Sequence, residues 1–363
     1  MDGVLIAGGG TGGHIYPAVA IVQAIRKIKP DLQIDFVGTP KGLETKIIPR
    51  EKFPLHLLNI GALNSVSVFT KIWTVLSLPF AIIGAMGLIR KLRPKVILGV
   101  GGYASGPVML AAVLLKPFLK VKLALFEANA YPGLTNRWLS NFVDMSFTNF
   151  EVSNKFFKNP ITVGIPIRDG LAPSAKTFSE RLRVLVFGGS QGARGINHTV
   201  TEAVKKGGPW LDNVEIVHQL GSTDFTKFDH LYRDLKPKNV KWFEFLYDMP
   251  DRYKWADLVV CRAGASTLAE LAACEKAAIL VPFPFAADNH QQENAQAIAS
   301  ENGAKMILQK DFTPEKLSKL IEEALNDRAL LARYEKTIGK FFKPKSAERV
   351  AKELLGQEIG NPK

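Results

Sequence analysis

Short apolar runs alternate with amphipathic segments through the first half of the chain. The apolar runs have the length of buried strands, and the segments between them repeat apolar residues at helical spacing. Strands are predicted at Val4–Ala7, Ile34–Val37, Leu55–Leu58, Val96–Val100, Leu123–Phe126, Met145–Thr148 and Ile161–Val163. Helices are predicted at Pro17–Lys27, Lys41–Glu51, Val108–Leu115 and Thr135–Ser140. This alternation is typical of a parallel sheet covered on both faces.

The alternation begins again after residue 180. Strands are predicted at Val184–Phe187, Glu215–Gln219, Val240–Phe243, Leu258–Cys261 and Ala278–Val281. The intervening segment 166–180 has the composition of a linker, and 363 residues suffice for two cores. We therefore predict an α/β protein of two Rossmann-like domains, residues 1–165 and 166–339, with parallel sheets facing a central cleft. The charged helical end of the chain could pack on either domain, and we assign residues from about 340 to 363 to the first.

The first strand of each half runs into a glycine loop. The loops are Gly8–Gly13, followed by His14, and Gly188–Gly192, followed by Ala193. Such a turn presents backbone N–H groups and the positive end of a helix, which suits a phosphate. In the second loop Ser190 could donate a hydroxyl and cap the next helix, and a tight turn with a capping serine would also explain that loop.

Neither loop carries a complete nucleotide fingerprint. Gly8, Gly10 and Gly13 match G-x-G-x-x-G, but the second strand ends in Gly38 rather than in an acidic residue, which disfavours NAD. The second loop is not a Walker loop, because no Gly-Lys-Ser/Thr follows it. The chain contains no Asp-x-Asp, the carboxylate pair that a metal-bound diphosphate usually needs. The sequence therefore predicts no cofactor and no metal.

Several reactive side chains follow predicted strands. His14 can take a proton near neutral pH, although a histidine at a helix start is often only a surface residue. Glu270 could accept two bonds from a ribose diol or could simply complement a helix dipole. The amides of Gln291 and Gln292 could read sugar hydroxyls. In a parallel sheet all of these positions lie at one edge, beyond the carboxyl ends of the strands.

The charge of the chain is unevenly distributed. The formal net charge is +13, and no Asp or Glu occurs between Lys52 and Phe126. Within that stretch Ile72–Ile89 has no charge, so it could be a packed helix that touches a membrane, a wholly buried helix or a membrane span. The basic residues cluster around this apolar segment rather than with exposed aromatics, which argues against nucleic acid. The two cysteines, Cys261 and Cys274, fit a reducing compartment.

Seven motifs together resemble the MurG family, the peptidoglycan enzymes of glycosyltransferase family 28. They are GGGTGGHIYPA at 8–18, GVGGYASGP at 99–107, EANAYPGLTN at 127–136, VGIPIR at 163–168, GGSQGAR at 188–194, CRAGASTLAE at 261–270 and VPFPFAADNHQQENA at 281–295. The resemblance covers almost the whole chain. It implies the glycosyltransferase B architecture and an inverting transfer of N-acetylglucosamine from UDP-N-acetylglucosamine. The acceptor would be lipid I, the undecaprenyl-diphosphate-linked MurNAc-pentapeptide, and the products would be lipid II and UDP.

The resemblance also implies site residues. For the general base it points to His14 first and Glu127 second. Residues implied to bind substrate are Thr11, Gly12, Gly13, Asn129, Arg168, Ser190, Leu246, Ala265, Ser266, Thr267, Leu268, Ala269, Glu270, Gln291 and Gln292. Among these, Glu270 would hold the ribose, Ser190 the diphosphate and Leu246 the uracil through its backbone.

The implied lipid acceptor gives the basic apolar stretch a purpose. We expect residues 71–95 to hold the protein at an anionic membrane surface, peripherally on the cytoplasmic face of the bacterial plasma (inner) membrane. Two alternatives stay open. One is another enzyme of the same architecture, such as a diacylglycerol glycosyltransferase or a UDP-sugar epimerase. The other is a non-catalytic nucleotide-binding protein.

Overall fold

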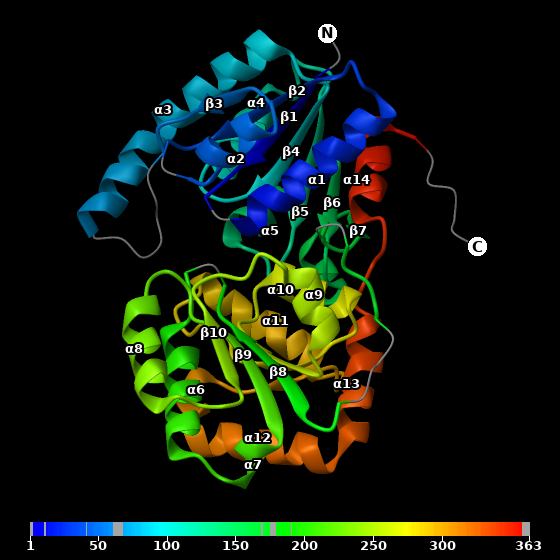
Figure 1. The fold of residues 1–363 in the computed structure, drawn as a ribbon. Helices are drawn as coiled ribbons and strands as arrows, with labels where there is room; N and C mark the ends of the chain where they lie inside the picture. Colours follow the sequence, from blue (N-terminus) through cyan, green and yellow to red (C-terminus); the bar gives the residue numbers. More distant parts are fainter. Residues whose placement is uncertain are drawn as a thin grey trace. The chain divides into compact units, whose positions relative to one another are not determined.

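The computed structural model describes residues 3–10, 12–40, 42–60, 68–167, 170–174, 179–189 and 191–357, without the side chains of 68–75. The chain divides into two compact units (Figure 1). Unit 1 comprises Met1–Ile167 and Lys343–Lys363, and unit 2 comprises Arg168–Phe342.

Unit 1 is built on a parallel sheet. Within the described residues it has seven strands in the order β3-β2-β1-β4-β5-β6-β7. The strands are β1 (Gly3–Gly8), β2 (Gln33–Gly38), β3 (Leu55–Leu57), β4 (Val96–Gly101), β5 (Lys122–Glu127), β6 (Met145–Thr148) and β7 (Pro160–Thr162). The helices are α1 (Gly12–Ile28), α2 (Glu44–Arg50), α3 (Val68–Leu92), α4 (Ser105–Leu115), α5 (Leu134–Leu139), the 3-10 helix η1 (Glu151–Phe156) and α14 (Ser346–Leu355). The central strands are buried on both faces, which explains their unbroken apolar runs.

Unit 2 repeats this plan. Its described strands form a six-stranded parallel sheet in the order β10-β9-β8-β11-β12-β13. The strands are β8 (Leu182–Phe187), β9 (Val214–Gln219), β10 (Val240–Phe243), β11 (Leu258–Cys261), β12 (Ala277–Leu280) and β13 (Lys305–Met306). The helices are α6 (Arg194–Lys206), α7 (Pro209–Asp212), α8 (Phe225–Leu235), α9 (Met249–Trp255), α10 (Ala265–Ala273), α11 (His290–Ala299), α12 (Pro314–Asn326) and α13 (Arg328–Gly339), with 3-10 turns η2 (Ala287–Asn289) and η3 (Gln309–Asp311).

The end of the chain forms two helices that pack on different units. Helix α13 packs on α10 and β12 of unit 2, whereas α14 packs on α1 of unit 1. Ser346 at the start of α14 donates a hydrogen bond to the Gly164 carbonyl, and the Lys122 ammonium donates to the Glu353 carbonyl. These bonds fasten the last helix to the first unit.

The predicted strands are confirmed within one or two residues, but α1, α2 and α4 begin at other residues than predicted, and one edge strand was not predicted. Helix α1 begins at Gly12 and not at Pro17, so the proline lies inside the helix and leaves the Gly13 carbonyl without its i+4 donor. The edge strand β13 was not predicted, because two residues carry no alternating pattern.

Candidate functional site

The glycine loops lie at the switch point of each sheet. In unit 1 the strand order reverses between β1 and β4, and in unit 2 it reverses between β8 and β11. At a switch point the connections that follow the two adjacent strands run to opposite faces of the sheet. A crevice therefore forms beyond the carboxyl ends of these strands. The Gly8 and Gly188 loops follow β1 and β8, and the candidate residues at the end of β5 and after β10, β11 and β12 lie along the same edges.

His14 lies where two glycine segments of unit 1 meet. The Gly9 N–H donates to the Gly101 carbonyl over 3.3 Å, which joins the loop after β1 to the end of β4. A Cβ on Gly101 would come 2.8 Å from Cε1 of His14, so the half-buried imidazole rests directly on this glycine. The ring of the first candidate base therefore lies against the end of β4. Gly12 and Gly13 begin α1 beside it.

Glu127, the second candidate base, is engaged by its own loop. It is buried, with 4% of its surface exposed. Oε1 accepts the backbone N–H of Asn129 at 3.0 Å and its side-chain amide at 3.1 Å. Oε2 accepts the Asn136 amide at 2.8 Å and the Gly133 N–H at 3.3 Å. Burial raises the pKa of Glu127 and these four donors oppose the rise. A raised pKa suits a general base, but the donors occupy both oxygens.

The second glycine loop is closed by backbone and amide contacts. The Gly192 N–H donates to the Gly189 carbonyl at 2.9 Å, and the Gln219 amide donates to the same carbonyl at 2.9 Å. The following helix, α6, has Ala193 at its N-cap, with no side-chain cap and no acid in its first turn. Ser190, which was predicted to cap this helix, lies outside the described residues.

Helix α10 begins in a similar way. Gly264 is its N-cap, no side chain caps it and no acid lies in the first turn. The side chains of Ser266 and Thr267 are partly exposed at this end, whereas Leu268 belongs to the core and could offer only its backbone to a ligand.

Glu270, further along α10, is buried but linked to the hydroxyl of Tyr253. That hydroxyl donates to Oε2 over 3.0 Å. Burial and then the nearby Glu270 charge raise the pKa of Tyr253 well above its usual value, so the hydroxyl stays a donor. Tyr253 thus orients the carboxylate that was predicted to hold a ribose.

The amide cluster after β12 sits on a strained turn. Asp288 and Asn289 have φ values of 51° and 54°, a left-handed conformation that costs free energy outside glycine. Asn289 occupies the N-cap of α11 without a side-chain cap. Gln291 Oε1 accepts the Phe283 N–H at 3.0 Å, and Gln292 is exposed.

Two family models match the chain. The glycosyltransferase family 28 N-terminal domain matches residues 4–148, and the family 28 C-terminal domain matches residues 183–350. The chain belongs to glycosyltransferase family 28. A relative from Bdellovibrio bacteriovorus is 46% identical over 97% of this chain and 98% of its own length. It is named UDP-N-acetylglucosamine--N-acetylmuramyl-(pentapeptide) pyrophosphoryl-undecaprenol N-acetylglucosamine transferase.

Solved structures agree with this family 28 assignment. The MurG of Acinetobacter baumannii superposes with a TM-score of 0.80 at 28% identity, covering 98% of this chain and 100% of that one. The predicted glycosyltransferase B fold is thereby confirmed. A UDP-GlcNAc 2-epimerase from Neisseria meningitidis has a TM-score of 0.64 at 11% identity, covering 98% of this chain and 100% of its own, which shows a shared fold alone.

Three predicted site residues of this family 28 chain lie outside the described residues: Thr11, Arg168 and Ser190. The other predicted site residues lie at or beyond the carboxyl end of a strand in the unit to which each belongs. Leu246, which follows β10, is buried. The partners Tyr253 and Asn136 were not predicted, because each makes its contact through tertiary structure.

Helix α3 has one face in the core of unit 1 and another outside it. Ala85 and Ile89 pack into the core that α4 shares, whereas Leu76, Phe80 and Ile83 are exposed. Figure 1 shows α3 running along α4, with its N-terminal part reaching beyond the sheet. The wholly buried alternative is therefore wrong. Among the described residues no helix combines the length and apolarity needed to cross a bilayer.

Proposed function

We propose that this family 28 enzyme transfers N-acetylglucosamine from UDP-N-acetylglucosamine to the 4-hydroxyl of the MurNAc-pentapeptide in lipid I, producing lipid II and UDP. The observation that carries the proposal is the near full-length similarity to a relative of that name, at 46% identity. At 11% identity, the likeness to the epimerase supports only a common fold.

The donor diphosphate fits the strand edge of unit 2. Helices α6 and α10 both start there without a side-chain cap and without an acid in the first turn. Uncapped helix starts leave N–H groups and the positive dipole end for an anion. Glu270 would hold the ribose, and Ser266 and Thr267 the phosphates and sugar. Leu246 would contact uracil through its backbone.

The acceptor and the base belong to unit 1 in this proposal. The acceptor 4-hydroxyl oxygen attacks the anomeric carbon, the bond from that carbon to the UDP oxygen breaks, and UDP leaves with the bonding electrons. His14 takes the hydroxyl proton, and the helix starts of unit 2 stabilise the charge that grows on the diphosphate. The contacts of Glu127 favour a role in holding Asn129 over a role as the base.

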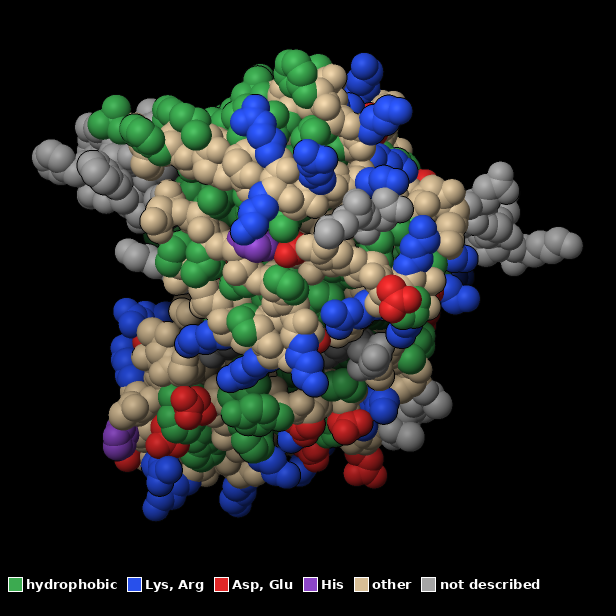
Figure 2. Space-filling model, turned by 90° about the horizontal axis from the view of Figure 1, so that it is seen from above, with side chains coloured by type: hydrophobic (Ala, Val, Ile, Leu, Met, Phe, Trp, Pro, Cys, Tyr) green, Lys and Arg blue, Asp and Glu red, His purple; other side chains and the backbone are tan. Residues whose placement is uncertain are grey.

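Membrane attachment is supported by the surface around α3. The exposed Leu76, Phe80 and Ile83 lie on a helix whose last turn contains Arg90 and Lys91. In the upper part of the face shown in Figure 2, hydrophobic side chains lie beside Lys and Arg with few acidic side chains among them, whereas acidic side chains are more frequent in the lower part. Near an anionic surface each Lys or Arg contributes about 1 kcal/mol. We propose that this surface places the enzyme peripherally on the cytoplasmic face of the plasma membrane.

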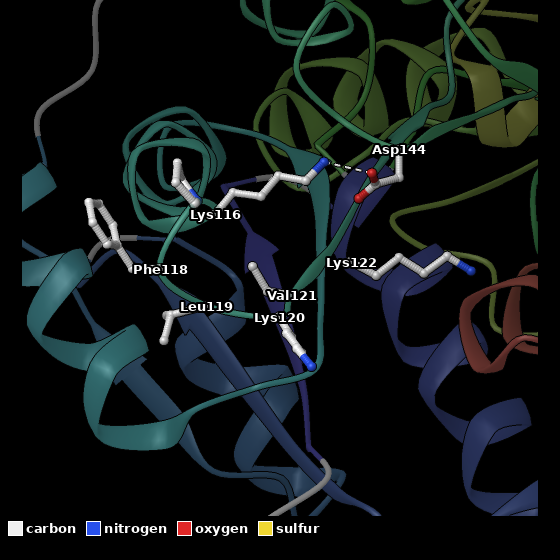
Figure 3. Close-up of a pocket in the computed structure, with 8 residues that line it drawn as sticks. Lys116, Phe118, Leu119, Lys120, Val121, Lys122 and Asp144 are labelled. Carbon is white, nitrogen blue, oxygen red and sulfur yellow. Dashed lines mark hydrogen bonds and ion pairs between the residues drawn. The ribbon is translucent and has the colours of Figure 1, made fainter.

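The loop after α4 also combines lysines with an exposed apolar side chain. Residues 116–122 and Asp144 line an open hollow of about 730 Å³ (Figure 3). Phe118 at its rim is 82% exposed. The Lys116 ammonium is turned to Asp144 at 2.6 Å, and Lys120 is exposed.

Transfer of labelled N-acetylglucosamine from UDP-N-acetylglucosamine tests the activity directly. We expect a labelled lipid-linked disaccharide and UDP release only with lipid I. Release of UDP with diacylglycerol, or conversion of the UDP-sugar without an acceptor, would contradict the proposal in favour of the related enzymes. Binding of UDP-sugar without either reaction would favour the non-catalytic alternative.

Vesicle co-sedimentation tests the membrane surface. Phe80→Ser should weaken binding to vesicles that contain phosphatidylglycerol. Phe285→Ser is the matched control, because the two rings are 76% and 77% exposed in different units. Equal loss in both variants, or equal binding to purely zwitterionic vesicles, would contradict the membrane proposal.

A further inference from the structure

Glu44 is a buried carboxylate that neither the motifs nor the comparisons assign a role. It is the first residue of α2 and has no exposed surface. Its Oε2 accepts the Gly10 N–H at 2.8 Å. Its Oε1 accepts the N–H and the hydroxyl of Thr39 at 2.8 and 3.0 Å. One side chain thus joins the first glycine loop, the end of β2 and the start of α2.

Three glycines make room for this carboxylate. A Cβ on Gly9, Gly38 or Gly42 would collide with the Glu44 side chain. Gly9 lies in the first glycine loop, Gly38 ends β2 and Gly42 precedes α2. One buried side chain therefore explains why glycine is needed in three separate segments. This indicates that the fold is arranged around the Glu44 carboxylate.

The glycine loop carries this constraint to His14. Gly9 is bonded to the Gly101 carbonyl, and a Cβ on Gly102 would collide with the Gly9 backbone. The His14 ring rests on Gly101. The contacts thus run from Glu44 through Gly9 and Gly10 to Gly101 and then to the imidazole.

We propose that Glu44 is a positioning residue that takes the place of a ligand anion in the first glycine loop and thereby sets the position of His14. The Gly10 N–H, which a phosphate would otherwise attract, is bonded to an internal carboxylate. The catalytic part of this inference rests on the proposed function, whereas the part about loop order stands on the contacts alone.

The test compares two buried carboxylates of the same unit. In Glu44→Gln the amide would present a donor to the Gly10 N–H or to the Thr39 donors, so the loop loses part of its support. The matched control is Asp35→Asn on β2, because Asp35 is also buried but accepts from Gln33 and His56, both at 2.8 Å.

Two readouts separate positioning from general stability. For Glu44→Gln we expect faster amide hydrogen exchange in the segment 8–15 and a fall in kcat of about 10- to 100-fold, since a misplacement near 1 Å costs about that much. Affinity for UDP, measured by calorimetry, should stay within about twofold. For Asp35→Asn, thermal stability should fall without either change. Glu44→Asp, which keeps the charge on a shorter side chain, should be intermediate.

Normal exchange in segment 8–15 and normal kcat in folded Glu44→Gln would overturn the proposal. If that variant does not fold, the same result in Glu44→Asp would overturn it. Absence of transfer by the unmodified enzyme would refute the proposed function instead, and the exchange comparison would still decide whether Glu44 orders the loop.

Discussion

Glu127→Gln distinguishes a general base from a residue that holds its loop. The carboxylate accepts from two backbone N–H groups and from the amides of Asn129 and Asn136. Glutamine keeps one accepting oxygen and turns an NH₂ group toward the other pair of donors. The substitution therefore removes two bonds to a charged acceptor while leaving the shape of the side chain almost unchanged.

The expected loss follows from those two bonds. Each hydrogen bond to a charged group contributes about 1.5–3 kcal/mol. Part of the loss is offset, because burial disfavours the charged form, as the raised pKa of Glu127 indicates. We expect a net loss of about 2–4 kcal/mol, below the typical stability of a domain. The enzyme should fold with a loosened segment 128–136.

Steady-state kinetics against pH is the assay. For a positioning role, kcat should fall by about 10- to 100-fold with the pH of half-maximal rate unchanged, and Asn136→Ala should produce a smaller fall of the same kind. For a general base, Glu127→Gln should lower kcat by about 10²- to 10⁴-fold and shift the acidic limb of the profile. A shifted limb together with a fully active Asn136→Ala variant would refute the reasoning.

Further predictions concern the base, the ribose, metal and pH. His14→Ala should lower kcat by about 10²- to 10⁴-fold with little change in UDP affinity, and unchanged turnover would remove His14 from the role. Glu270→Ala should mainly weaken UDP binding by calorimetry, and unaltered affinity would contradict the ribose assignment. Transfer should persist in excess chelator, so a strict magnesium requirement would count against the metal-independent reaction. Burial lowers the pKa of His218 from 6.5 to about 3, so the unfolded chain takes up its proton first as the pH falls. His218 should therefore remove about 2 kcal/mol of stability between pH 7.5 and 5. Urea unfolding of His218→Gln should lack this contribution, and an unchanged pH dependence would contradict it.

The fold was predictable because its strands are short, unbroken apolar runs that alternate with segments of helical spacing. The start of α1 was not, because Pro17 suits the first turn of a helix and so suggested a later beginning. The site was predictable in residue type, since the motifs name His14 and Glu270. Their partners were not, because Tyr253 reaches Glu270 from another helix.

The two glycine loops also show that the sequence predicts a residue type but not its distant partners. Their sequences are alike because both need glycine where a strand turns toward a helix at a switch point. Their chemistry depends on distant groups. Gly10 donates to a carboxylate 34 positions away, whereas the N-cap residue of α6, Ala193, has no capping side chain. An internal anion disfavours a second anion beside it, while an uncapped helix start attracts one. The donor diphosphate should therefore bind at the second loop, while the first loop positions the base.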